Sequence, residues 1–408
     1  MDKICFIILR YGDEVDGGAE KHCRMLAERL VGGYEVDILT TKFIDYNTFV
    51  PFYKNDIDYL NGVRILRFGS IDFDSRKRDI LWKKALRFQK IRRNLFRLKS
   101  LKLVSELFPS WKGISGADID YFKSHGSYSP SMLSYINNNH QHYKAIIGIT
   151  YSQPNTFFGA LIAPEKSILI PTLHEEREAF RPILTQLFSK VKHIAFNTEE
   201  ERNLAFNIFG SHIANNSIVA VGVEVSTPLD KETLYSKFQL PKNYLLYFGR
   251  VCNTKVRTLI PWFLRYKQKY PSDLKLVLTG RIFMDKTEHP DVIYTDFVTE
   301  EEKTALIENA RAVINPSQYE SLSLLLLETM VLGKPILVNG KSKVMKEHCI
   351  KSNYAAQYYS SESDFQRKLC QILEGDVSFM RSISISYVEN NYSWPLVIKK
   401  LTHIIDSI

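Results

Sequence analysis

Short apolar runs with the length of buried strands alternate with helical patterns along most of this 408-residue chain. Because strands that alternate with helices form parallel sheets covered on both faces, this rhythm predicts an α/β protein. The runs fall into two blocks, so we expect two Rossmann-like, doubly wound domains. The expected strands are 3–9, 35–41, 63–68, 145–150, 167–171, 193–197, 217–221, 244–248, 274–279, 292–295, 312–315 and 335–338.

The rhythm breaks at about 70–140, and this break contains a strongly basic segment. Twelve basic residues and a single acid lie between Arg76 and Lys102, whereas the whole chain carries a net charge of +9. Apolar residues at Phe88, Ile91, Leu95 and Leu98 predict an amphipathic helix with a basic polar face. Such a helix suits an anionic membrane surface or packing on its own domain with a solvated basic face.

The expected domains are therefore an N-terminal domain over 1–235 with a basic helical insertion at about 70–140, and a C-terminal domain over 236–390. A last amphipathic helix occupies 391–408. Hydrophobic content of 45% and charged content of 24% are those of a soluble globular protein. No apolar run approaches the roughly 20 residues of a membrane span.

Cysteine use and motif content exclude several other classes of protein. The five cysteines are scattered and form no C-x-x-C pair, which argues against a disulfide framework or a zinc site. A reducing cytosol is the simplest compartment. No recognised nucleic-acid-binding motif accompanies the basic segment, so we expect no nucleic-acid partner.

The stretch 315–340 is the main candidate for a ligand site. A turn at Asn315-Pro316-Ser317 leads into a leucine-rich run that stops at Gly333, a pattern that predicts a helix with a serine N-cap and a glycine C-cap. The helix mouth at Ser321-Leu322-Ser323-Leu324 would offer unpaired N–H groups to a phosphate.

Two glutamates belong to the same stretch. Glu320 lies on the loop and could accept hydrogen bonds from sugar hydroxyls. Glu328 lies inside an apolar helix, where it is costly without a partner, and a ribose diol would be one. An ordinary amphipathic helix with a capping serine and a solvated glutamate explains the same pattern.

A second candidate loop follows the expected strand 244–248. Gly249-Arg250 and Lys255 place two cations on a loop that opens toward a helix. Two fixed cations there could clamp a pyrophosphate and stabilise it as a leaving group. Two surface cations with no ligand are the alternative.

Three features of the first block are less specific. Gly17-Gly18 precedes a helix without the G-x-G-x-x-G of a dinucleotide site, and a flexible turn would explain it. His174 follows a strand end, the place where ligands bind in doubly wound domains. Thr198 and the acidic residues after it indicate a helix N-cap.

Together, Glu320, Glu328 and the Gly249-Arg250…Lys255 loop resemble the E-x7-E signature and phosphate loop of retaining nucleotide-sugar glycosyltransferases. These enzymes form family four of the GT-B fold (glycosyl transferases group 1). Serines stand at Ser321 and Ser323, and a valine at position 256, where that family usually has glycine. The resemblance implies two Rossmann-like domains that face each other across a cleft.

By this resemblance the chain would be a metal-independent transferase of the hexosyl type that retains the anomeric configuration. A nucleoside-diphosphate sugar would be its co-substrate, with no cofactor, and a glycan, expected to be lipid-linked, its acceptor. The lack of an obvious D-x-D pair agrees with a metal-free reaction. Bacterial surface polysaccharide assembly (O-antigen, capsule or lipopolysaccharide) at the inner face of the plasma membrane is the expected setting.

The resemblance also implies roles for individual residues. The expected catalytic residues are His174, Arg250, Lys255 and Glu320. The expected donor-binding residues are Gly17, Gly18, Gly249, Arg250, Lys255, Gly280, Val298, Glu320, Ser321, Leu322, Ser323, Leu324 and Glu328. A GT-B nucleotide-sugar epimerase and a non-catalytic, glycosyltransferase-like binding subunit remain open as alternatives.

Overall fold

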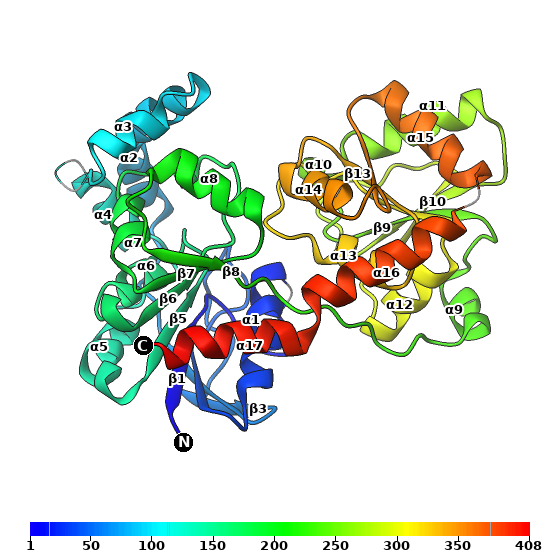
Figure 1. The fold of residues 1–408 in the computed structure, drawn as a ribbon. Coiled ribbons are helices and arrows are strands. Elements are labelled where there is room, and N and C mark those ends of the chain that lie inside the picture. The colour runs from blue at the N-terminus through cyan, green and yellow to red at the C-terminus, as the bar shows by residue number, and fades with distance from the viewer. Residues whose placement is uncertain (16, 112, 114, 376) are drawn as a thin grey trace. The chain divides into compact units, whose positions relative to one another are not determined.

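The computed structural model describes residues 1–15, 17–111, 113, 115–375 and 377–408. The chain packs as two compact units (Figure 1). The first unit comprises Met1–Val221 and Val397–Ile408, and the second comprises Gly222–Leu396. The chain thus leaves the first unit once and returns to it for its last residues.

The first unit is built on an eight-stranded sheet whose strands pair in parallel except for β3 with β4. In spatial order the strands are β3 (Ile57–Leu60), β4 (Val63–Phe68), β2 (Glu35–Thr41), β1 (Lys3–Ile7), β5 (Ala145–Ile149), β6 (Ser167–Ile170), β7 (His193–Phe196) and β8 (Asn215–Ile218). The chain order reverses between β1 and β5, as in a doubly wound domain.

Helices cover both faces of this sheet, with α5 and α6 on one face and α1 and α17 on the other (Figure 1). The helices of the unit are α1 (Gly18–Leu30), α2 (Ser75–Arg97), α3 (Leu101–Leu107), α4 (Gly116–Lys123), α5 (Pro130–Asn139), α6 (Pro154–Ala160), α7 (Leu184–Lys190) and α8 (Glu199–Phe209). The last helix, α17 (Trp394–Asp406), places its C-terminal part in this unit, where Lys144 and Tyr34 bind Asp406.

The second unit has a six-stranded, wholly parallel sheet. Its spatial order is β11 (Val292–Asp296), β10 (Lys275–Thr279), β9 (Tyr244–Phe248), β12 (Ala312–Asn315), β13 (Ile336–Asn339) and β14 (Gln357–Tyr359). The order reverses between β9 and β12, so the loops that follow these two strands are neighbours at the carboxyl edge of the sheet.

Helices also surround the second sheet. They are α9 (Lys231–Phe238), α10 (Asn253–Val256), α11 (Leu259–Lys269), α12 (Glu300–Asn309), α13 (Leu324–Val331), α14 (Lys343–Lys351), α15 (Glu362–Glu374) and α16 (Ser378–Tyr392). Helices α11 and α15 close one apolar core through side chains such as Phe263 and Leu369. Helix α13 packs against α16.

These sheets confirm the predicted α/β class with two doubly wound units. The pattern missed β3 and β14, which are short, and it placed β8 at 217–221 instead of Asn215–Ile218. Strand β3 is an edge strand with two exposed positions, and its sequence therefore lacks the apolar run by which buried strands are found.

The basic insertion contains the predicted helix, α2, but only part of the predicted apolar face is confirmed: Leu95 packs against the apolar core and Phe88 is half-buried. Ile91 and Leu98 are 41% and 76% exposed, whereas Ala85, Gln89 and Arg92 are buried. Each of the two polar side chains donates one hydrogen bond to a backbone carbonyl, Gln89 to Arg177 and Arg92 to Ile208. A hydrophobic period cannot reveal a helix face that is held by such bonds.

The loops that follow β9 and β10 approach each other at two glycines. A Cβ on Gly280 would lie 2.2 Å from the carbonyl oxygen of Gly249, and Gly280 has φ +122°. Hydrogen bonds continue the contact, since Val251 donates to Arg281 and Phe283 donates to Val251, at 2.9 and 2.8 Å. Glycine at position 280 therefore sets the path of the loop that leads toward Lys255.

We expect Gly280→Ala to destabilise the second unit by about 2 kcal/mol or more, because the added methyl meets fixed backbone and the residue keeps a positive φ. Urea unfolding followed by circular dichroism measures this change. Gly69→Ala is the control, since a Cβ there has open space and its φ is not positive. Equal unfolding midpoints for the two variants would contradict the close approach.

Candidate functional site

The reversal of strand order in the second unit brings two of the predicted loops into contact. Lys255, on the short helix α10 that follows β9, donates to Ser317 Oγ at 2.6 Å and to Glu320 Oε1 at 2.8 Å. The Lys255 and Glu320 side chains are 24% and 23% exposed, so both reach solvent. A cation and a carboxylate predicted from separate motifs therefore meet at one carboxyl edge.

The loop that carries Ser317 and Glu320 is fixed by two asparagines at strand ends. Asn315 accepts from the Ser317 backbone N–H at 3.1 Å and donates to Ser323 Oγ at 3.0 Å. Asn339 donates to the carbonyl oxygen of Pro316 at 3.0 Å. Because both amides are buried, these bonds hold the loop in one shape before any ligand arrives.

Helix α13 begins at Leu324, and the predicted serine cap needs correction. Ser323 occupies the N-cap position at φ +74°, but its side chain makes no capping hydrogen bond; its hydroxyl accepts from Asn315 instead. A residue with a side chain thus adopts the left-handed region that glycine favours. The predicted glycine stop is confirmed, since Gly333 follows at φ +64°.

Glu328 lies on α13 and is buried, with a partner that the sequence did not indicate. Lys303 of α12 donates to Glu328 Oε1 at 2.8 Å and also pairs with Glu300. Burial alone would lower the pKa of Lys303, but the two carboxylates outweigh it and raise the pKa above its usual value. The pair removes the cost of a lone buried charge, and the contact with a ribose stays a prediction.

His348 of α14 binds the backbone of the loop that precedes α13. Its Nε2 lies 2.9 Å from the carbonyl oxygen of Leu322, and its Nδ1 lies 2.9 Å from the hydroxyl of Tyr387. Since a carbonyl can only accept, Nε2 carries the proton and Nδ1 accepts from Tyr387 in the neutral ring. Burial lowers the pKa of His348 to about 4. A lone histidine inside a helix gave no sequence signal for this role.

The other predicted residues of the second unit lie around these loops. Gly249 and Arg250 follow β9, Gly280 follows β10, and Val298 is buried just after β11. Arg250 is exposed, and its carbonyl oxygen accepts from the Tyr247 hydroxyl at 2.9 Å. Ser321 and Leu322 precede α13 on the loop that His348 holds.

In the first unit, His174 lies on the loop after β6, half-buried. Its Nε2 is 3.5 Å from Glu176 Oε2, and Glu176 accepts from the Tyr151 hydroxyl at 2.7 Å. Burial opposes ionisation of Glu176, but hydrogen bonds and the charge of His174 outweigh it and lower its pKa. Gly17 and Gly18 stand at the start of α1, after β1.

The predicted helix cap at Thr198 is confirmed, and the capped residue Glu201 makes further contacts. Thr198 Oγ1 accepts from the Glu201 backbone N–H at 3.1 Å, while the buried Glu201 carboxylate accepts from the backbone N–H groups of Asn197 and Leu173. Glu201 therefore anchors the residue next to His174. The sequence showed the cap but not this second contact, because Leu173 is distant along the chain.

Metal ligands do not gather in the described residues, since no group of three or more His, Cys, Asp or Glu side chains there could hold an ion. An ammonium, a hydroxyl and a helix N-terminus lie on neighbouring loops of the second unit, and groups of these kinds can bind an anion.

Comparisons with known proteins agree with this geometry. Residues 242–374 match the family model described as glycosyl transferases group 1. No curated protein matches the chain in sequence.

Solved structures match over the whole chain. Sucrose-phosphate synthase from Thermosynechococcus elongatus aligns with 13% identity and a TM-score of 0.66, covering 100% of this chain and 99% of that one. Anabaena HepE in complex with UDP and glucose aligns with 11% identity and a TM-score of 0.68, covering 100% of both chains.

WaaG, a glycosyltransferase involved in lipopolysaccharide biosynthesis, aligns with 12% identity and a TM-score of 0.62, covering 98% of this chain and 99% of that one. The fold is GT-B. The predicted fold class is thereby confirmed, and the matched family model supports a transferase enzyme.

His348 predicts a pH dependence of stability. The pKa of His348 is lower in the folded chain than its value of about 6.5 in the unfolded chain. Between these two values the unfolded chain binds a proton at His348 and the folded chain does not. Stability should therefore fall as the pH drops from about 6.5 to 4, by roughly 3 kcal/mol from this residue. His348→Gln, which keeps an N–H donor for Leu322, should flatten this part of the curve.

The measurement is the thermal midpoint of unfolding across this pH range. His403→Gln is the control, because His403 is exposed on α17. An identical slope for the wild type and His348→Gln would show that the buried imidazole does not stay neutral.

Proposed function

We propose that this chain is a glycosyltransferase that moves a sugar from a nucleoside-diphosphate sugar to a glycan and retains the anomeric configuration. The observation that carries the proposal is the contact of Lys255 with Ser317 and Glu320 beside the N-terminus of α13. The group 1 match over 242–374 covers all of these residues and supports the same reading.

The proposed chemistry is electrostatic. In the free protein Glu320 neutralises Lys255. A bound diphosphate would displace Glu320 and form an ion pair with Lys255. It would also accept hydrogen bonds from the Ser317 hydroxyl and from the free N–H groups at the start of α13. Arg250, on the loop before Lys255, would add a second cation. These donors would stabilise the charge that builds on the diphosphate as the sugar leaves.

Once displaced from Lys255, Glu320 would take part in binding the donor sugar. Its carboxylate would be released to accept hydrogen bonds from the hydroxyls of the donor sugar. Glu328 would meet the ribose, while Gly280 and Val298 would lie along the nucleoside. A uridine nucleotide is the first donor to test, because similar structures were solved with UDP and glucose and with UDP-2-fluoro glucose.

In the first unit, a catalytic role for His174 and a donor-binding role for Gly17-Gly18 stay predictions of the resemblance. Nucleotide-sugar epimerisation uses the same diphosphate site, and release of an epimerised nucleotide-sugar without acceptor would identify it. A binding subunit without catalysis would show no nucleotide-dependent transfer. The ion pair at Lys255 favours transferase chemistry over this subunit, since a binding subunit needs no diphosphate site.

We expect Lys255→Ala to weaken UDP binding by roughly 10-fold to 100-fold, because a charge-assisted hydrogen bond contributes about 1.5–3 kcal/mol. Isothermal titration measures the affinity. Lys242→Ala is the matched control, since Lys242 is exposed and precedes β9 at the opposite end of the strand. Equal affinity for UDP in Lys255→Ala and the wild type would refute the proposed diphosphate site.

We further propose that the acceptor is lipid-linked and that the helices α2 and α3 contact an anionic bilayer, as expected in surface polysaccharide assembly at the inner face of a plasma membrane. Large apolar side chains stand exposed among the basic residues of this segment, namely Ile80, Ile91, Leu98, Leu103, Leu107 and Phe108. Basic residues attract anionic headgroups, and apolar ones enter the acyl boundary. None of the helices in the described part of the chain has the length and apolarity of a membrane span.

The wild type should therefore sediment with phosphatidylglycerol vesicles and much less with phosphatidylcholine vesicles. Leu98→Ser combined with Leu107→Ser should reduce this binding by at least 10-fold, since both side chains are more than half exposed. Phe379→Ser is the control, because Phe379 is 71% exposed on α16 in the second unit. Wild-type protein that ignores phosphatidylglycerol vesicles, or a control that loses as much binding, would reject the contact.

A further inference from the structure

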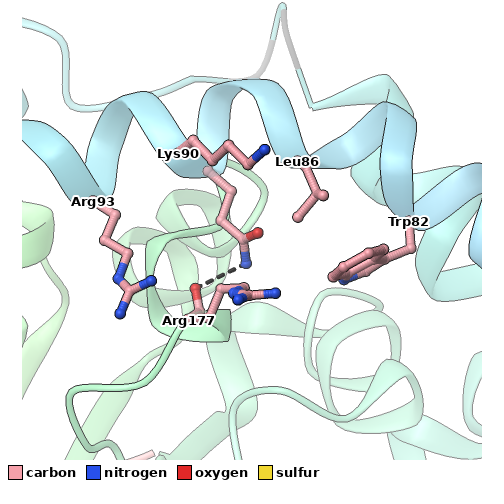
Figure 2. Close-up of a pocket in the computed structure, with 6 residues that line it drawn as sticks. Trp82, Leu86, Lys90, Arg93 and Arg177 are labelled. Carbon is pink, nitrogen blue, oxygen red and sulfur yellow. Dashed lines mark hydrogen bonds between the residues drawn. The ribbon is translucent and has the colours of Figure 1, made fainter.

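A small cavity lies between α2 and the loop that follows His174, with basic residues at its wall (Figure 2). It measures about 210 Å³ and is lined by Trp82, Leu86, Gln89, Lys90, Arg93 and Arg177. Helix α2 contributes Trp82, Leu86, Lys90 and Arg93, and Arg177 lies on the opposite loop (Figure 2). The α2 residues recur at a spacing of three and four, which places them on one stripe of the helix.

The cations of this cavity have no acidic partners of their own. Among the described residues no carboxylate lies within ion-pair distance of Lys90, Arg93 or Arg177. Arg177 instead lies over the Trp82 ring, with its guanidinium carbon 5.7 Å from the ring centroid. The guanidinium group of Arg93 or of Arg177 can bind a phosphate or carboxylate in a planar geometry, through two parallel N–H donors.

A buried amide completes the cavity. Gln89 is 1% exposed, and its Nε2 donates to the carbonyl oxygen of Arg177 at 2.8 Å. Its Oε1 is buried and accepts no hydrogen bond within the described structure. A buried acceptor without a donor is costly, and a ligand hydroxyl would satisfy it. A carboxylate alone would not, because it carries no proton at neutral pH.

We propose that this cavity binds a single sugar residue that carries a phosphate or a carboxylate. The anionic group would lie on Arg93 and Arg177, one hydroxyl would donate to Gln89 Oε1, and the sugar ring would lie near Trp82. The volume is below the roughly 300 Å³ at which pockets for drug-sized ligands begin, and it therefore suits one sugar ring.

The cavity lies on the same loop as His174. Arg177 follows His174 by three residues on the loop after β6, and Gln89 binds the backbone of that loop. The inference rests on the proposed function in one respect, since the anionic sugar is taken to be a residue of the acceptor glycan. The binding itself needs no nucleotide.

The test is a set of titrations of the full chain with glucose 6-phosphate, glucuronate, glucose and inorganic phosphate. At least one of the two anionic sugars should bind 10-fold more tightly than glucose and than phosphate, and the tighter one identifies the anionic group. Arg177→Ala and Arg93→Ala should each weaken this binding by at least 10-fold. Lys84→Ala, an exposed change on the same helix, should leave it unaltered.

Three results would overturn the inference. One is the absence of binding by either anionic sugar. Another is binding of glucose or phosphate as tight as that of the anionic sugars. The third is an equal loss in Lys84→Ala and Arg177→Ala. A UDP titration of the same variants separates the two proposals: Arg177→Ala should bind UDP as the wild type does, and a failure confined to UDP would remove the donor site and leave this cavity standing.

Discussion

The reversal of strand order between β9 and β12 is the constraint on which the rest of the second unit depends. Parallel strands end at one edge of a sheet, and the two strands at the reversal send their loops in opposite directions from a common point. The loop after β9 brings Lys255 there, and the loop after β12 brings Ser317 and Glu320. Ligands of doubly wound domains bind at such a point.

Buried polar contacts keep this edge in one shape. Asn315 fixes the loop at its start, and a neutral His348 holds the Leu322 carbonyl at its end. Below them Lys303 and Glu328 join α12 to α13 as a buried ion pair. Loss of one partner from such a pair leaves an uncompensated charge, which is strongly destabilising. Changes to these buried contacts would therefore destabilise the second unit. Lys255 and Glu320, by contrast, reach solvent and can exchange partners.

The sequence predicted the fold class because buried parallel strands are nearly continuous apolar runs, and these stand out in 244–248 and 312–315. It also predicted that Lys255 and Glu320 belong to one site, through motifs on two loops. It could not show that Ser323 adopts a positive φ, because a residue with a side chain rarely does so, or that Asn315 binds its hydroxyl. It missed Lys303 and His348, whose partners lie far along the chain. The buried face of α2 was predicted only in part, because Gln89 and Arg92 are also buried there and bind carbonyl oxygens.

The central claim is that a diphosphate binds at the reversal and replaces Glu320 as the partner of Lys255. A crystal structure of the chain with UDP tests this claim most directly. The account predicts the diphosphate within hydrogen-bonding distance of Lys255 Nζ and of the first N–H groups of α13, with the Glu320 carboxylate released from the lysine. A diphosphate bound elsewhere, with the Lys255–Glu320 contact intact, would contradict it.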